Sequence, residues 1–116
     1  MINIGNIIPG YIYYVSLNDA TGHEQFEDRP ALVISVHKDT KLAVVIPFTT
    51  SMDAKRFSYT VEIKKTSFNN LKYDSIAMIF QIRAISNQRF KSSSGVLEDN
   101  YMKLIKTNIS LFLKIP

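Results

Sequence analysis

The chain has 116 residues, 46% of them hydrophobic, and its 14 Lys and Arg outnumber its 10 Asp and Glu to give a formal net charge of +4. We expect one domain, residues 1–116, large enough to bury a core without a metal or disulfide. The absence of Cys excludes disulfides, thiolate zinc sites and a cysteine nucleophile. No apolar run has the length of a membrane span and residues 1–18 carry no charged side chain, so we expect no membrane association, no signal peptide and a cytoplasmic location.

Basic residues are concentrated in one segment, residues 55–91. They are Lys55, Arg56, Lys64, Lys65, Lys72, Arg83, Arg89 and Lys91, and the only acidic residues among them are Glu62 and Asp74. Such a segment attracts a polyanion. A solubilising surface would have the same composition, so charge alone leaves both interpretations open.

Five strands are predicted along most of the chain. Residues 11–17 (YIYYVSL) place β-branched and aromatic residues at period two, which is typical of a strand. Residues 31–36 and 42–48 are short apolar runs separated by a polar turn, as in buried strands. Residues 58–64 alternate strictly between apolar and polar, which predicts a half-buried antiparallel strand. Residues 75–85 are longer but rich in Ile and Phe, which favours a strand over a buried helix.

The pattern changes at residues 97–115, where apolar residues recur at helical spacing. They are Leu97, Tyr101, Leu104, Ile105, Ile109, Phe112 and Leu113. Residues 98–100 supply a capping and acidic first turn. Residues 91–95 (KSSSG) are interpreted as a polar turn. Strands followed by one helix predict a mainly β fold, a small and partly closed antiparallel barrel with a C-terminal helix.

Apolar residues on both faces of the 75–85 strand exceed what one small core needs. Ile76, Met78 and Phe80 are expected to oppose Ala77, Ile79 and Ile82. The closing helix adds Leu111 beside its stripe. This excess predicts a homodimer. The alternative is a central strand covered within one chain by the helix and an opposing sheet.

No metal or nucleotide motif is present. His23 and His37 lack the spacing of metal ligands and no carboxylate cluster accompanies them. The glycines are scattered rather than gathered in a phosphate-binding loop. We therefore predict no metal and no cofactor, while a ribonuclease that uses the two histidines stays an alternative.

Two loops are unusual for a purely structural role. Residues 22–30 (GHEQFEDRP) form a long, charged connection between strands, and such loops are often functional. At residues 47–51 (PFTTS), Pro ends a strand and hydroxyl groups follow it. A salt bridge within the first loop and a capped strand end in the second would also explain these residues.

The same two loops carry a resemblance to a known family. The blocks GYIYYV, GHEQFEDRPALVIS, AVVIPFTTS, SIAMIFQIRAIS and GVLEDNYMKLIKTNI occur in the order and spacing of PemK/MazF bacterial toxins. The chain resembles that family throughout its length. The resemblance implies a small SH3-like β-barrel, metal-independent endoribonuclease activity on single-stranded RNA, a cognate antitoxin, and a homodimer whose subunits share the bound RNA.

The resemblance also implies site residues. It assigns Arg29 and Thr49 as the principal catalytic residues, with Glu24, Gln25 and Gln81 as neighbours. The chain departs from the family beside the arginine. Glu27 and Asp28 stand there, where a small residue is common, and their carboxylates would repel an RNA phosphate.

RNA cleavage through the ribose 2′-hydroxyl needs a proton acceptor, stabilisation of the phosphorane charge, and a proton for the leaving oxygen. The guanidinium of Arg29 suits charge stabilisation, and Thr49 could donate to a phosphate oxygen. Glu24 could accept the 2′-hydroxyl proton or form a salt bridge with Arg29. For RNA binding, the residues expected are Gln25, Lys55, Arg56, Lys64, Lys65 and Gln81 for polar contacts and Phe26 or Phe57 for stacking. The alternative function is a catalytically silent relative that binds RNA or an antitoxin-like peptide.

Overall fold

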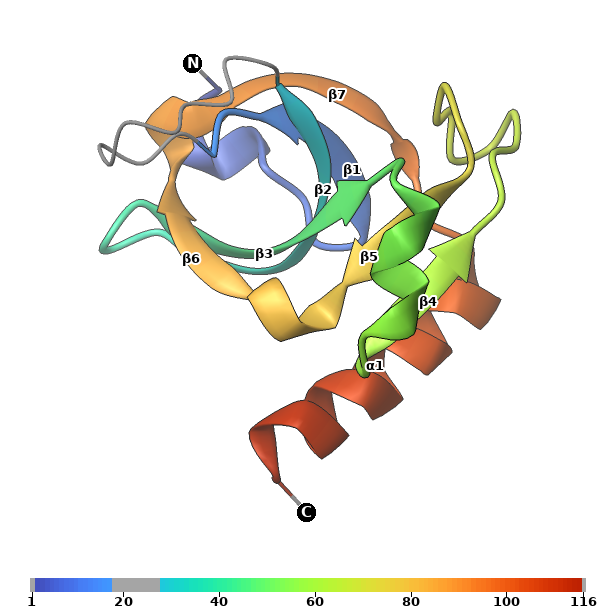
Figure 1. Ribbon diagram of the computed structural model, residues 1–116. Coiled ribbons are helices and arrows are strands. Elements are labelled where there is room, and N and C mark those ends of the chain that lie inside the picture. The colour runs from blue at the N-terminus through green and yellow to red at the C-terminus, as the bar shows by residue number, and fades with distance from the viewer. Residues whose placement is uncertain (1, 18–27, 116) are drawn as a thin grey trace, which may run out of the picture.

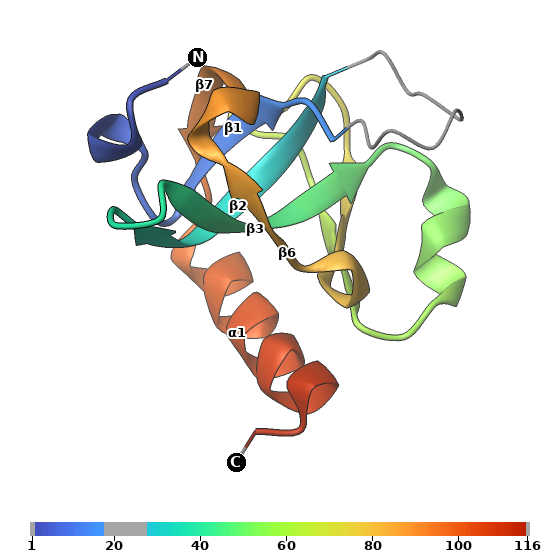
Figure 2. The same cartoon turned by 90° about the vertical axis from the view of Figure 1, so that its left-hand side faces the viewer.

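The protein folds as a curved antiparallel β-sheet with one long helix, described for residues 2–17 and 28–115 by a computed structural model. The strands curl around a common axis and the helix packs against one side of the sheet (Figures 1 and 2). Within the described ranges the strands are β1 (Tyr11–Val15), β2 (Arg29–His37), β3 (Leu42–Thr49), β4 (Thr60–Ile63), β5 (Ser75–Met78), β6 (Arg83–Ser86) and β7 (Phe90–Val96). The helix is α1 (Asp99–Leu113). The prediction of a mainly β chain with a C-terminal helix is confirmed.

Strand β3 has different partners along its length. The strand order is β4–β5–β3–β2–β1–β7, with every neighbouring pair antiparallel. Strand β6 pairs with the first half of β3, whereas β5 pairs with its end at Phe48 and Thr49. A register shift between Val33 and Ser35 interrupts the β2–β3 ladder, and an extra residue of this kind bends and twists a strand pair. Beyond this shift, the end of β3 lies next to β5.

Two hydrophobic clusters lie on opposite faces of the central strands. The cluster that faces α1 includes Ile12, Leu32, Ile46, Phe48 and Ile105. The cluster on the other face includes Tyr13, Ala31, Val33, Val45 and Phe90. Because successive side chains of a strand point to opposite faces, a strand buried on both faces needs apolar residues at consecutive positions. This explains the continuous apolar runs of β2 and β3.

Helix α1 covers the first cluster with only part of its predicted apolar stripe. Ile105 is fully buried, and the residues packed beside it are Tyr101, Met102, Ile109 and Phe112. Leu104 and Leu113, predicted on the packed face, are instead 52% and 46% exposed. The stripe is narrower than predicted because one sheet face can only contact one side of a helix. Among the described residues, no helix combines the length and apolar character that a membrane crossing requires.

The predicted strand at residues 75–85 is wrong as a single element. It divides into β5, the 3₁₀ helix η3 (Ile79–Gln81) and β6. The residues of β5 are all buried inside one chain, and Ile79 of η3 is buried in the cluster under α1. The residues of β5 and Ile79 are therefore covered without a second subunit, whereas Phe80 and Ile82 are half-buried. This weakens that argument for a homodimer.

The polar turn predicted at residues 91–95 is also wrong. These residues lie inside β7, which pairs with β1 from Tyr11 to Val15. Backbone hydrogen bonds hold the strand while the side chains of Lys91, Ser92 and Ser93 are exposed. Because the outer face of β7 needs no apolar residues, the sequence here carries no alternating pattern.

Candidate functional site

A cavity of about 300 Å³ opens where the start of β2 meets the end of β3. Antiparallel pairing explains the meeting. Ala31 pairs with Pro47, so that Arg29, two residues before Ala31, and Thr49, two residues after Pro47, lie at the same end of the ladder. Both residues line the cavity. The structure thus brings together the two residues that the resemblance places in the catalytic site, and their roles stay predictions.

Arg29 is held by the backbone of β2. It is the first residue of the strand and pairs with Val15 of β1, while the adjacent Pro30 pairs with Tyr14. Its side chain is half-buried at the cavity. A planar guanidinium in such a place can donate two parallel hydrogen bonds to the oxygens of a phosphate.

A hydrogen bond from the backbone orients the side chain of Thr49. The Thr49 Oγ1 atom accepts a hydrogen bond of 3.2 Å from the backbone N–H of Ser51. A hydroxyl group has one proton to donate and two lone pairs, so this contact orients the oxygen and the O–H can still be donated to a ligand. Thr50 also lines the cavity, and it is exposed.

Asp28 places a negative charge in the same cavity. Its side chain is exposed and lines the cavity directly before Arg29. A carboxylate at this position opposes the binding of an anion in the cavity.

The remaining wall of the cavity comes from residues that sequence reasoning missed. They are Tyr14 of β1 together with Leu71, Lys72, Tyr73 and Ser75, from the end of the β4–β5 connection and the start of β5. The Lys72 Nζ atom lies 5.8 Å from the centre of the Tyr14 ring, within the range of a cation–π contact. The sequence shows this connection only as a polar loop before a strand, because nothing local indicates which way it folds.

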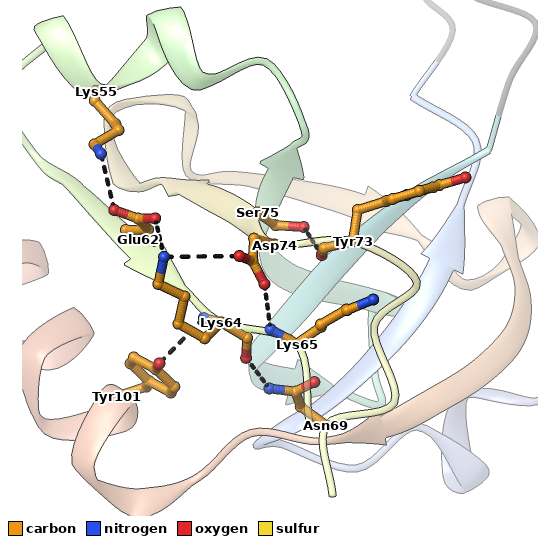
Figure 3. Close-up of polar contacts among 9 residues, drawn as sticks. All are labelled: Lys55, Glu62, Lys64, Lys65, Asn69, Tyr73, Asp74, Ser75 and Tyr101. Carbon is orange, nitrogen blue, oxygen red and sulfur yellow. Dashed lines mark hydrogen bonds and ion pairs between the residues drawn. The ribbon is translucent and has the colours of Figure 1, made fainter. Parts of the chain in front are cut away.

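Two of the three lysines predicted to bind RNA phosphates are engaged in ion pairs. Lys55 and Lys64 each lie 2.9 Å from a carboxylate oxygen of Glu62, and Lys64 is also 3.6 Å from Asp74 (Figure 3). Hydrogen bonds from Lys64 and then Lys55 lower the pKa of Glu62, and the Glu62 carboxylate raises the pKa of Lys64. Their charges are thus partly compensated within the chain.

The other predicted binding residues lie at separate places. The guanidinium of Arg56 stacks 4.8 Å from the centre of the Phe57 ring. The backbone N–H of Lys65 donates to Asp74. Gln81 is exposed in η3 and, of the residues described, does not belong to those that line the cavity. RNA contacts by these side chains stay predictions.

The two-histidine alternative gains no support from the part of the chain that can be described. His37 ends β2, at the opposite end of the strand from Arg29, and its ring contacts the Ser35 hydroxyl at 2.9 Å. His23, Glu24, Gln25, Phe26 and Glu27 lie outside the described residues. Within the described ranges, no group of three or more His, Asp or Glu residues could hold a metal ion.

Comparison with known proteins identifies relatives along nearly the whole chain. The endoribonuclease MazF of Staphylococcus saprophyticus is 28% identical over 107 residues, which are 90% of this chain and 88% of the relative. The crystal structure of MazF from Deinococcus radiodurans matches with a TM-score of 0.75 at 18% identity and covers 94% of this chain and 97% of its own. An endoribonuclease from Mycobacterial species, solved with its cognate antitoxin, matches with a TM-score of 0.72 at 17% identity and covers 95% and 97%.

The family itself is shown by the match to a family model. The model of the PemK-like, MazF-like toxins of type II toxin–antitoxin systems matches residues 8–113, a range that contains every strand, α1 and the cavity. The two solved structures support the same fold. The chain belongs to the PemK-like, MazF-like toxin family.

Proposed function

We propose that this chain is an endoribonuclease toxin that cleaves single-stranded RNA without a metal ion or cofactor and inhibits growth. The observation that carries the proposal is the meeting of Arg29 and Thr49 in one open cavity. Family membership and a relative named as an endoribonuclease support it.

In the proposed reaction the ribose 2′-hydroxyl attacks the adjacent phosphorus and the 5′-oxygen leaves. The Arg29 guanidinium stabilises the charge that develops on the phosphorane oxygens, and Thr49 donates a hydrogen bond to a non-bridging oxygen. Glu24 is proposed as the acceptor of the 2′-hydroxyl proton, with Gln25 beside it. A guanidinium can also provide a proton donor near the leaving oxygen.

A cognate antitoxin is the proposed protein partner, and a homodimer is the proposed state of the toxin. Support for the first comes from a relative solved in complex with its antitoxin. Support for the second comes from Leu104 and Leu111, which are 52% and 59% exposed on α1. The proposed place of action is the cytoplasm, where messenger RNA is translated.

A second candidate function is a catalytically silent relative that binds RNA or an antitoxin-like peptide. Asp28 favours this candidate because its carboxylate lines the cavity and repels a phosphate. The silent protein would use the same cavity but would leave bound RNA intact.

Incubation of the purified chain with a long single-stranded RNA separates the two candidates. The proposed toxin produces discrete cuts, and its expression without an antitoxin arrests bacterial growth. RNA that binds but stays intact, together with normal growth, would establish the silent candidate instead.

A further inference from the structure

The β4–β5 connection, residues 64–74, is long but internally fixed. At its centre Asn69 is fully buried. Its Oδ1 atom accepts hydrogen bonds from the backbone N–H groups of Thr66 and Leu71, at 3.0 and 3.1 Å. Its Nδ2 atom donates to the Lys64 carbonyl and to Glu98 Oε1, at 2.9 and 3.1 Å. The Asn69 side chain thus provides hydrogen-bond partners for backbone groups of the turn, and its own buried amide is hydrogen-bonded, as buried polar groups usually are.

The two ends and one flank of this connection are also tied down. The Lys65 backbone N–H donates to Asp74 Oδ1 at 2.9 Å, across the neck of the loop (Figure 3). Asn70 and Ser94 of β7 exchange two hydrogen bonds, each from a side chain to a carbonyl, at 3.1 and 3.2 Å. Gly95 touches the Asn69 backbone so closely that a Cβ atom there would overlap it. The loop is therefore a rigid support rather than a mobile tip.

This support presents two exposed side chains to the cavity. Leu71 is buried in the core and anchors the backbone directly before Lys72 and Tyr73. Tyr73 is 66% exposed, and its side chain extends away from Asp74, which turns back to the Lys64 ion pair (Figure 3). Lys72 lies over the Tyr14 ring at the cavity. Long ordered loops that expose aromatic residues at a cavity are often binding elements.

We propose that Tyr73 stacks on an unpaired RNA base next to the scissile phosphate and that Lys72 binds a neighbouring phosphate group. This inference rests on the proposed function of the Arg29 and Thr49 site. An aromatic ring beside a lysine matches the alternation of base and phosphate along single-stranded RNA. Among the described residues that line the cavity, Lys72 and Arg29 are cationic and Asp28 is anionic, which favours an anionic strand such as RNA over an uncharged peptide.

Binding to a short RNA that spans a mapped cut, with one 2′-deoxyribose to block cleavage, tests the stacking. Tyr73→Ala should weaken binding about 5- to 100-fold, the range for loss of one base–aromatic stack, while Tyr73→Phe should bind like the wild type. Phe68→Ala is the matched control, because Phe68 is 56% exposed in the same loop and does not line the cavity.

An abasic scan of the same RNA locates the contact. Removal of one base should weaken binding to the wild type and leave binding to Tyr73→Ala unchanged at that position. If every abasic site has the same effect on both proteins, Tyr73 does not stack and the inference is wrong.

The salt dependence of binding tests Lys72. Lys72→Ala should reduce the slope of log affinity against log salt by about 0.7, the value for one phosphate contact on a single strand. Lys103→Ala, which removes an exposed charge on α1, should leave the slope unchanged. Equal slopes for all three proteins would contradict the phosphate contact.

The outcomes separate this inference from the function on which it rests. If the wild type cuts no RNA, the proposed function fails and the inference fails with it. If the wild type cuts RNA and Tyr73→Ala cuts it with the same KM and kcat, only the inference fails. If Tyr73→Ala and Lys72→Ala lose binding to the antitoxin but bind RNA like the wild type, this wall of the cavity binds the antitoxin and the inference is wrong.

Discussion

Arg29 and Thr49 reach the same cavity because β2 begins where β3 ends. Neither residue is distinctive on its own, since an arginine before a proline and a threonine at a strand end are both common. Their meeting follows from the register that pairs Ala31 with Pro47. At the scale of single residues, strand pairing places both residues at one cavity, and the proposed chemistry uses the guanidinium of the first and the hydroxyl of the second.

Arg29→Ala should reduce RNA cleavage by about 10²-fold or more, the size of the loss of one transition-state donor. The unfolding midpoint should stay nearly unchanged, because the residue is at the edge of the core. Thr49→Val should act in the same direction but more weakly. Cleavage rates and thermal unfolding of both variants check this, and full activity of Arg29→Ala would remove Arg29 from the site.

Asp28→Asn should increase kcat/KM by roughly fivefold at low salt, because it removes a charge that repels the phosphate at short range. The gain should shrink as salt is added. Asp39→Asn is the matched control, since Asp39 is exposed in the turn after β2, away from the cavity. Equal gains in the two variants would mean that only net charge matters.

Tyr14, Lys72 and Tyr73 could not be predicted as site residues. The two loops that resemble the family are recognisable in the sequence, and they contain Arg29 and Thr49. The position of Lys72 and Tyr73 at the cavity depends on how residues 64–74 pack against β7 and the start of α1. Contacts such as the hydrogen bond from Asn69 to Glu98 fix this packing. Such contacts join distant segments and leave no local pattern.

At the scale of elements, the strands with alternating or continuous apolar residues were predictable, and the irregular segments were not. β2 and β3 are buried on both faces and their sequence shows it. The 3₁₀ helix η3 is as apolar as the strands that flank it, so the break in residues 75–85 has no signal. β7 is held by backbone pairing with β1 and does not depend on apolar side chains. Its serine-rich sequence therefore looks like that of a turn.

Gly95→Ala should destabilise the protein by about 1–3 kcal/mol, the usual cost of forcing an extra methyl group into a packed place. The added Cβ would meet the backbone of Asn69 and lie 2.8 Å from the Phe68 carbonyl oxygen. Gly5→Ala is the control, because its nearest neighbour would be Asn3 Oδ1 at 3.6 Å. Denaturant unfolding of both variants measures the difference, and equal stabilities would show that the 64–74 loop is free to move.

At the scale of the whole molecule, one chain covers its own β5, so a dimer must use other surfaces. Leu104 and Leu111 lie two turns apart on the outer side of α1 and are exposed. The wild type should therefore have a mass near twice the 13.2 kDa of one chain by light scattering at micromolar concentration.

A variant with Leu104→Lys and Leu111→Lys should have the mass of one chain and an unchanged unfolding midpoint. Ser110→Lys, at another exposed position of α1, should stay dimeric. A wild type with the mass of one chain would contradict the dimer and the sharing of RNA between two subunits.

The most direct test of the proposed function is the chemistry of the cut ends in excess EDTA. The purified chain should still cut single-stranded RNA, since the proposed reaction uses Arg29 and Thr49 in place of a metal ion. Arg29→Ala should cut it more slowly by about 10²-fold or more. Attack by the 2′-hydroxyl predicts a 2′,3′-cyclic phosphate or a 3′-phosphate on the upstream fragment. Upstream fragments that end in a 3′-hydroxyl, or the loss of all cleavage on addition of EDTA, would contradict the proposed mechanism.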